Sequence, residues 1–254
     1  MSGPPEPLER YAAATLRLAQ AAGAKPASLE MAVAALDRSR PLLPEANPVW
    51  LPAGAGPETV RIAARLLHER GGGRALCHLP EGAPAMRQAL ENQGFDVQAL
   101  AVIARGPGAP AEVPAGFALR PVDSDRDRMA WEQILVEDLA ELEEPASRAA
   151  HTLEWLGAAG GRLWLGVQGE APAVAAALAP AGDSGFVPVL VERPVMRRRG
   201  LGLGALTALG SAAPPGAEGP LIAAIPWEER EQTGGLRGAV PGGRILRFAL
   251  EAAP

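Results

Sequence analysis

The chain has 254 residues, enough for one large domain or two small ones, and either arrangement could bury a hydrophobic core. Hydrophobic residues make up 48% of the sequence and charged residues 21%, a balance that argues against extensive disorder. The net charge of −5 argues against a broad nucleic-acid-binding face, so we expect no nucleic-acid partner.

No apolar run reaches the roughly 18–20 residues that a membrane-spanning helix needs. The segment from Met1 to Pro7 lacks the basic-then-apolar order of a signal peptide. We therefore expect a cytoplasmic protein without a membrane partner. The single cysteine, Cys77, excludes an internal disulfide and any metal site built from several cysteines, and we predict no metal cofactor.

The first part of the chain alternates predicted helices and strands. Apolar spacing and capping residues predict helices over residues 8–22, 28–37 (with Ser28 as N-cap), 57–69 and 84–93. Extended segments are expected at 47–52, 75–79 and 97–104. The alternation predicts an α/β domain over residues 1–105.

Residues 106–114 are rich in glycine and proline without hydrophobic periodicity, which predicts a linker. The second predicted domain covers residues 115–254. We expect strands at 117–122, 163–167, 174–178, 186–191, 221–226 and 244–250, and helices at 123–142 and 146–156. The three consecutive strands between 163 and 191 suggest an antiparallel meander.

A basic, glycine-rich turn follows the strand at 186–191 and opens a further helix. It runs from Glu192 to Leu206 and contains ERPVMRRRGLGLGAL. Glycines let backbone N–H groups converge on an anion, and the helix N-terminus favours negative charge. A purely structural turn with solvated arginines is the alternative. A dinucleotide-binding turn fits less well, because glycines 200, 202 and 204 give G-x-G-x-G instead of G-x-G-x-x-G.

This segment resembles the pyrophosphate loop of the GNAT superfamily of N-acetyltransferases, (Arg or Gln)-x-x-Gly-x-(Gly or Ala). Arg197, Gly200 and Gly202 match the motif, and Pro194 occupies a position where the family tends to have proline. The order of elements over 117–209 is also similar to that of the family. The resemblance implies a GNAT-like α/β (α+β) fold, with a mixed, mostly antiparallel central sheet flanked by helices and a smaller N-terminal α/β domain.

The N-terminal part lacks a phosphate loop, yet its strand, helix and strand around Gln93-Gly94-Phe95 are similar to the closing half of a GNAT domain. A degenerate GNAT copy and an unrelated α/β cap both remain open. In either case we expect this part to cover the catalytic domain or to form a homodimer contact.

The resemblance implies acetyl-CoA as the co-substrate. Backbone amides of about Arg198 to Leu203 would hold the pyrophosphate, and the strand end from Leu190 to Glu192 would pair with pantetheine. The implied binding residues are Leu190, Val191, Glu192, Arg197, Arg198, Arg199, Gly200, Leu201, Gly202, Leu203 and Gly204.

Catalytic residues are harder to assign from the sequence. Acyl transfer to an amine needs a base and an acid, and Glu192 and Glu228 are our candidate bases because both follow predicted strands. Many relatives use a tyrosine as acid, but the only tyrosine of this chain is Tyr11.

An acidic rim is a further candidate feature. Glu137, Asp138 and Glu141 end a predicted helix in a region that borders the acceptor site in relatives, where they would favour a cationic amine. A solvated helix end is the alternative.

These observations predict an enzyme that transfers an acetyl group from acetyl-CoA to a primary amine of a small molecule or peptide. A non-catalytic acyl-CoA-binding or regulatory module is the second hypothesis, motivated by the missing tyrosine. A nucleotide-binding oxidoreductase is the third, and it requires affinity for NAD or NADP.

Overall fold

The computed structural model of the protein describes residues 6–29, 32–41, 43–69, 73–80, 84–106, 113–212, 219–226 and 239–251. The chain divides into two compact units. The first comprises Met1–Val102, Ala224–Glu228 and Pro241–Pro254, and the second comprises Ile103–Ala223 and Glu229–Val240. Among the described residues, no helix has both the length and the apolar character needed to cross a membrane.

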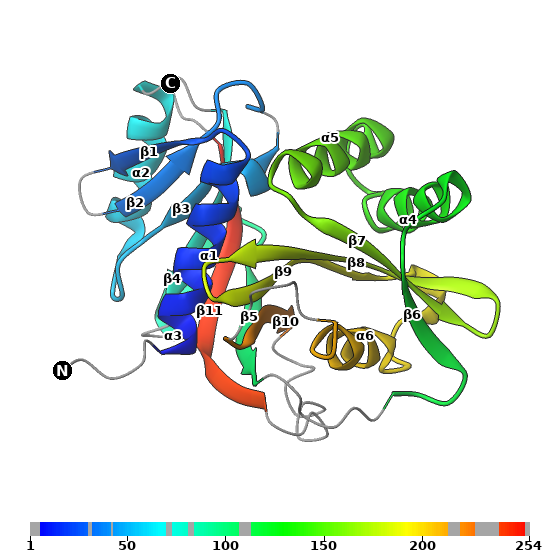
Figure 1. The fold of residues 1–254 in the computed structure, drawn as a ribbon. Helices are drawn as coiled ribbons and strands as arrows, with labels where there is room; N and C mark the ends of the chain where they lie inside the picture. The colour runs from blue at the N-terminus through cyan, green and yellow to red at the C-terminus, as the bar shows by residue number, and fades with distance from the viewer. Residues whose placement is uncertain are drawn as a thin grey trace. The chain divides into compact units, whose positions relative to one another are not determined.

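The sheet of the first unit is mixed (Figure 1). Its strands lie in the order β1-β2-β3-β4-β11-β5, with bounds Lys25–Leu29 (β1), Ala32–Leu36 (β2), Pro48–Trp50 (β3), Arg74–Pro80 (β4), Gln98–Arg105 (β5) and Ala239–Glu251 (β11). The β3–β4 pair is parallel, whereas β1–β2, β2–β3 and β4–β11 are antiparallel. The helices of this unit are α1 (Pro7–Ala21), α2 (Pro57–Glu69) and α3 (Pro84–Asn92), and the 3-10 turn η1 spans Pro44–Ala46.

The C-terminal strand, β11, belongs to the first unit and not to the second domain, where the sequence placed it. The sequence predicted one second domain over residues 115–254, but β11 pairs with β4 from Ile245↔Pro80 to Glu251↔Arg74. The first unit therefore includes this strand, and the chain passes from the first unit to the second between Val102 and Ile103, within β5. A linker composition at 106–114 does not reveal where a distant strand pairs, because pairing depends on long-range contacts.

The predicted helix at 28–37 is wrong. Residues 25–36 form a β-hairpin, in which Lys25 pairs with Leu36 and Ser28 with Val33. Alanine favours a helix, but β2 pairs with β1 along its whole length and is buried except at Val33, whose side chain is 58% exposed. Pairing of β2 with β3 outweighs the local helix propensity.

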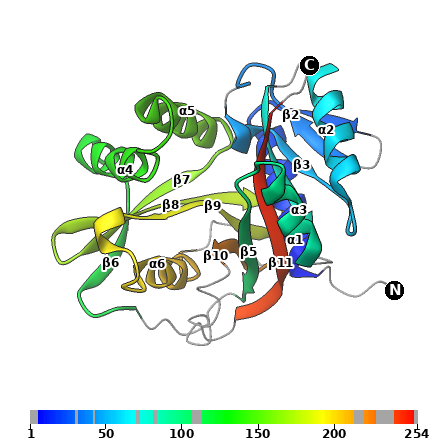
Figure 2. The same cartoon turned by 180° about the vertical axis from the view of Figure 1, so that it is seen from behind.

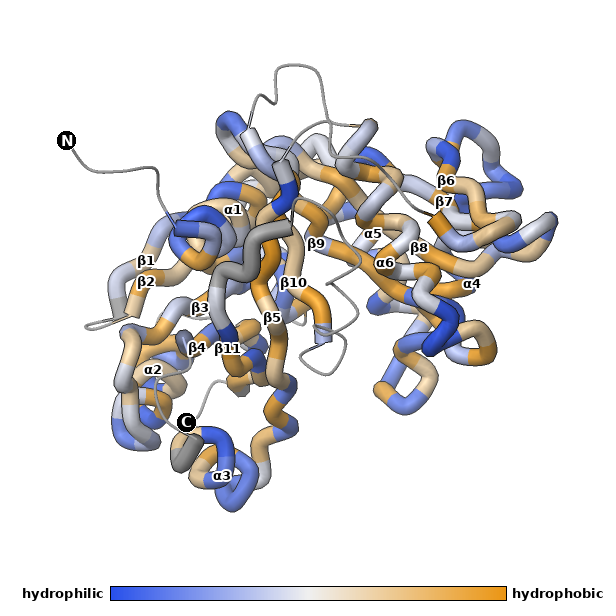
Figure 3. Tube along the Cα trace, turned by 90° about the horizontal axis from the view of Figure 1, so that it is seen from below, coloured by the Kyte–Doolittle hydropathy of each residue, from blue (hydrophilic) through white to orange (hydrophobic). Residues whose placement is uncertain are grey.

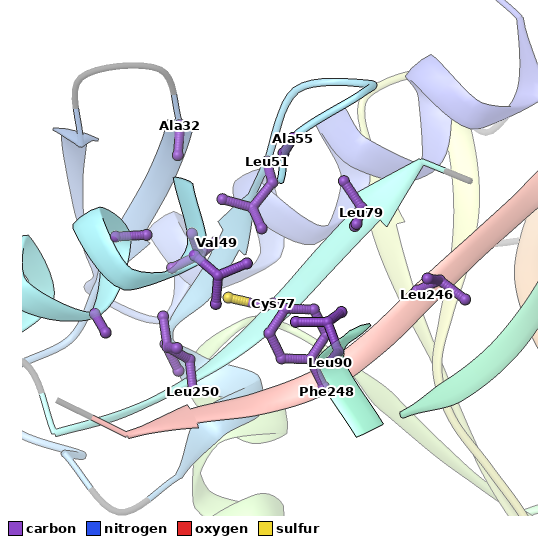
Figure 4. Close-up of a cluster of buried hydrophobic side chains, with 14 of the residues drawn as sticks. Ala32, Val49, Leu51, Ala55, Cys77, Leu79, Leu90, Leu246, Phe248 and Leu250 are labelled. Atoms are coloured by element: carbon purple, nitrogen blue, oxygen red, sulfur yellow. The ribbon is translucent and has the colours of Figure 1, made fainter. Parts of the chain in front are cut away.

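The other predicted helices and strands of the first unit are confirmed, within two residues at their ends for the helices. The core of this unit lies between the sheet and α2 and α3 (Figure 4). Alternate residues of β11, Leu246, Phe248 and Leu250, point into it. Cys77 lies among them, fully buried, and burial raises the pKa of its thiol, so it is a structural residue.

The second unit contains the predicted meander. Its strands lie in the order β10-β9-β8-β7-β6, with bounds Phe117–Pro121 (β6), Arg162–Gln168 (β7), Ala171–Ala181 (β8), Ser184–Glu192 (β9) and Leu221–Pro226 (β10). Strand β10 begins in this unit, and its residues from Ala224 onward belong to the first. All neighbours are antiparallel except β9 and β10. The mixed, mostly antiparallel sheet with flanking helices confirms the expected fold class.

Helices cover both faces of this sheet. Helices α4 (Asp125–Asp138) and α5 (Pro145–Ala158) lie on one side and α6 (Leu201–Leu209) on the other, as the two opposite views show (Figures 1 and 2). Ser124 caps α4 by accepting a hydrogen bond from the N–H of Asp127 at its side-chain oxygen. The helix ends at Asp138, earlier than the expected residue 142.

Small residues allow the helices to pack closely on β8. Residues 173–177 of this strand are four alanines and one valine, all fully buried, and hydrophobic residues predominate along β8 and β9 (Figure 3). The indole of Trp131 on α4 is also fully buried, and its Nε1 donates a hydrogen bond to the carbonyl of Ala176 at 3.0 Å. This bond satisfies the one polar atom of the largest core side chain.

Candidate functional site

Strands β9 and β10 are parallel neighbours over only part of their length. Leu221 pairs with Gly185 and Ile222 with Phe186, after which β9 continues to Glu192. In the described strands, the last part of β9 has no registered partner on that edge. Its backbone hydrogen-bonding groups on this side are therefore available to another extended chain or ligand.

A β-bulge lies where the two strands separate. Ala177 of β8 pairs with Val189 of β9, and the next registered pair is Ala179 with Phe186. Two positions along β8 therefore correspond to three along β9, so β9 carries one extra residue. Pro188 lies in this bulge, where the absence of an N–H costs no ladder hydrogen bond. A bulge bends the strand that contains it, which accounts for the departure of β9 from β10.

The chain between β9 and α6 turns through two residues in the left-handed region. After the 3-10 turn η2 (Pro194–Met196), Arg198 has a φ of 66° and Gly200 a φ of 71°. Glycine adopts this conformation freely, whereas an arginine pays on the order of 1 kcal/mol. Left-handed residues within such a turn direct successive N–H groups to one side, which is the geometry of an anion-binding nest.

The N–H groups of this loop have few acceptors. Gly204 is the first residue of α6 with a helical bond, from its N–H to the carbonyl of Gly200 at 3.0 Å. Gly202 donates instead to Oε1 of Glu192 at 2.5 Å. Within the described part of the chain, no acceptor meets the N–H groups of residues 198–201 or of Leu203. These donors converge at the positive end of a helix dipole and so favour an anion.

Two glycines of the motif allow close backbone approach. A Cβ on Gly202 would lie 2.8 Å from Oε1 of Glu192, and one on Gly204 would lie 2.6 Å from Cδ of Pro114. At Gly202 the neighbour is the end of a flexible side chain, so a Cβ there would displace the Glu192 carboxylate from the N–H of Gly202. At Gly204 the neighbour is a proline ring, so the absence of a side chain lets α6 pack on the segment that leads into β6.

Two ion pairs hold the start of the loop to the end of α4. Arg193 makes a bidentate contact with Glu137, with Nε–Oε2 and Nη2–Oε1 distances of 2.8 and 2.6 Å. The hydrogen bond from Arg193 lowers the pKa of Glu137 below its ordinary value. Arg197 donates from Nη2 to Oδ1 of Asp138. Two of the three predicted rim carboxylates are thus neutralised by arginines, and Glu141 lies exposed beyond the helix end.

The remaining arginines of the loop are available to a ligand. Arg198 and Arg199 are exposed, and the described residues offer neither of them an ion-pair or hydrogen-bond partner. Their charges flank the unpaired N–H groups, as expected for a site that binds phosphate.

The structure brings most of the predicted binding residues together. Leu190 packs with Leu201 and Ala205 in a small core beneath α6, and Glu192, two residues on along the strand, points to the same helix. Among the candidate bases, Glu192 has its Oε1 engaged by Gly202, and Glu228 lies outside the described residues. Both assignments stay predictions.

Arg105 is a residue that sequence analysis did not single out. It ends β5, is 3% exposed, and donates from Nη1 to the carbonyl of Thr207 at 2.5 Å. A cation at the last turn of α6 complements the helix dipole, so Arg105 anchors the end of the helix opposite the loop. In the sequence, the position of Arg105 directly after the apolar residues of β5 could have indicated a buried charge.

Comparison with known proteins yields only structural matches. No protein-family model matches the chain, and no curated protein matches it. A protein of unknown function from Staphylococcus epidermidis has a similar structure at 11% identity, with a TM-score of 0.63 and coverage of 91% of this chain and 95% of the other.

Named acetyltransferases are also similar over most of the chain. A GCN5-related N-acetyltransferase from Kribbella flavida has 18% identity and a TM-score of 0.56, covering 95% of this chain and 96% of its own. One from Sphaerobacter thermophilus has 17% identity and a TM-score of 0.53, covering 88% and 78%. The chain has the GNAT fold.

In this GNAT fold, the loop between β9 and α6 is the segment whose motif suggested the superfamily. The fold expected from that motif is confirmed. At these identities the likeness concerns the fold alone.

Proposed function

We propose that this protein is an N-acyltransferase that uses acetyl-CoA to acetylate a primary amine. The observation that supports this most directly is the set of N–H groups at the N-terminus of α6, from Arg198 to Leu201 and at Leu203, that meet no acceptor among the described residues. Backbone N–H donors at a helix N-terminus are the groups that bind phosphate oxygens.

The residues around the loop fit the rest of such a ligand. The free edge of β9 after the bulge offers N–H and C=O groups to the amides of a pantetheine arm. Arg198 and Arg199 supply positive charge for further phosphate oxygens. Gly202 and Gly204 present no side chains that would fill the first turn of the helix.

Acetyl-CoA supplies the acyl group as a thioester. In the proposed reaction the neutral amine nitrogen forms a bond to the acyl carbon, the carbon–sulfur bond breaks, and the amine proton is finally transferred to the thiolate. The protein binds and orients both reactants. We propose Glu141 as the remaining acidic contact for a cationic amine, since Glu137 and Asp138 are paired with arginines.

A non-catalytic acyl-CoA-binding protein is the second candidate function. The only tyrosine of the sequence, Tyr11, is buried in the first unit, so it does not serve as the acid that many relatives take from tyrosine. Binding without turnover on a panel of amines would favour this function over the enzyme.

Isothermal titration with acetyl-CoA tests the binding step before any acceptor is known, with NADH as the parallel ligand. We expect micromolar affinity for acetyl-CoA and no affinity for NADH. Gly202→Trp should abolish binding, because its side chain would occupy the first turn of α6. Gly157→Trp is the matched control, since a Cβ at this exposed glycine of α5 meets nothing within 4 Å.

Equal affinity of the wild type and Gly202→Trp would contradict the proposed site. Affinity for NADH in place of acetyl-CoA would favour the oxidoreductase hypothesis. If acetyl-CoA binds as expected, release of free CoA in the presence of an amine panel then distinguishes the enzyme from the binding module.

A further inference from the structure

We infer that Glu192 is an internal anion of the loop, which occupies one of its N–H donors and weakens the affinity for the ligand's diphosphate. This inference rests on the proposed function, because it concerns the same site. Glu192 lies outside the loop motif, and the inference gives it a role in setting the affinity for the ligand.

The position of the carboxylate supports this role. Glu192 ends β9, and its Oε1 accepts a hydrogen bond from the N–H of Gly202 at 2.5 Å. Gly202 is the second residue of α6, so this N–H is one of the donors that a helix leaves unpaired at its N-terminus. The carboxylate therefore takes the place that a phosphate oxygen would take on this donor.

The local charges explain why the site needs such an anion. The N-cap residue, Gly200, has no side chain that could satisfy the first turn, and Arg198 and Arg199 have no acidic partner among the described residues. The dipole of α6 and these two guanidinium groups concentrate positive charge at the loop. Glu192 offsets part of this charge in the ligand-free protein.

The same carboxylate opposes a second anion. A diphosphate on the neighbouring N–H groups of Leu201 and Leu203 would lie close to Glu192, and like charges at such distances repel. Binding therefore requires the carboxylate to release Gly202 or to remain beside the phosphates at an electrostatic cost. Either route lowers the affinity of the wild-type protein.

Glu192→Gln tests the charge with little change in shape, because the amide oxygen of glutamine can still accept from Gly202. We expect the Kd for acetyl-CoA to fall roughly tenfold, the size expected when one close repulsive charge is removed. Glu154→Gln is the control, since Glu154 is exposed on α5 with no partner among the described residues. The same charge change there should alter the Kd less than twofold.

The outcomes separate this inference from the proposed function. If the wild type binds acetyl-CoA and Glu192→Gln binds it equally or more weakly, Glu192 supports the loop and the internal-anion role is wrong. Loss of turnover at unchanged Kd would also overturn it, in favour of a catalytic base. If neither protein binds acetyl-CoA, both proposals fail, whereas binding by the variant alone supports both.

Discussion

The two units use polar groups in opposite ways. In the first unit, the buried Asp37 receives hydrogen bonds from Ser39 and Arg40, and the amide of Asn47 bonds to backbone groups on three sides. In the second unit, the loop before α6 has an arginine in the left-handed region and several N–H groups that meet no acceptor in the described part of the chain. The first arrangement satisfies its buried polar groups internally, while the second leaves donors that could bind a ligand.

The core of the first unit should show the largest effect. Phe248 is 2% exposed and its ring lies 5.2 Å from that of Phe95, so Phe248→Ala should cost about 3–5 kcal/mol of unfolding free energy. Urea denaturation followed by circular dichroism measures the loss. Val33→Ala, at an exposed position of β2, should change stability by less than about 0.5 kcal/mol. Similar losses for both variants would contradict the described core.

Packing of α6 is the corresponding test in the second unit. Gly204→Ala places a Cβ 2.6 Å from Cδ of Pro114 and should cost about 1–3 kcal/mol through strain. Gly157→Ala meets no neighbour within 4 Å, so it should be neutral or stabilising. Thermal unfolding of the two variants provides the comparison. A stabilising Gly204→Ala would mean that the helix does not approach Pro114 closely.

The stability of the first unit should depend on pH, because its core contains a buried histidine, His78. His78 stacks on Trp50 at 4.8 Å between ring centroids, with Tyr11 at its edge, and burial followed by the charge of Arg247 lowers its pKa from 6.5 to about 3. Between these two values His78 is protonated in the unfolded chain and neutral in the folded chain. The free energy of unfolding therefore falls as the pH drops from 6.5 towards 3.

Substitution of His78 measures this contribution. Relative to the wild type, His78→Phe should gain about 1–2 kcal/mol of stability between pH 7 and about pH 5.5, because phenylalanine cannot take up a proton. Urea denaturation at both pH values gives the difference. His68→Gln, at an exposed position of α2, should leave the pH dependence unchanged. Parallel curves for the wild type and His78→Phe would show that His78 does not titrate as described.

The ion pair at the loop should have the smallest effect on stability. Glu137→Gln removes the bidentate contact with Arg193 and should cost about 0.5–1 kcal/mol at pH 7, because both side chains are partly exposed. The lowered pKa of Glu137 means that this contribution is present above its ordinary pKa and is lost as the pH falls through the lowered value. The wild type and the variant should therefore converge in acid. A constant difference down to pH 2 would contradict the assignment.

The sequence predicted helices and strands well where residues close together in the chain decide them. Helix α2 has the expected bounds, because its apolar residues recur at helical spacing up to the glycines that follow. The hairpin at 25–36 was missed for the opposite reason, since its alanines favour a helix and only pairing with β3 makes it a strand. Whether the first unit is a degenerate GNAT copy stays a prediction.

The candidate site divides in the same way. The spacing of Arg197, Gly200 and Gly202 predicted a glycine-dependent turn before a helix, and the structure has this turn, with Gly200 in the left-handed region just before α6. That the turn binds an anion stays a prediction. The sequence did not show that Glu137 and Asp138 pair with arginines of the loop, because these contacts join residues more than fifty positions apart.

What the sequence alone determined about this protein is the glycine-rich turn before α6, most of its alternation of helices and strands, and the GNAT-like order of elements around the motif. Only the tertiary structure decided that β11 pairs with β4 in the first unit, that β9 leaves β10 at a bulge, and that Glu192 lies on the N–H of Gly202. Turn and helix signals act between near neighbours and can be read from them, whereas strand pairing and side-chain partners depend on which distant segments share one core.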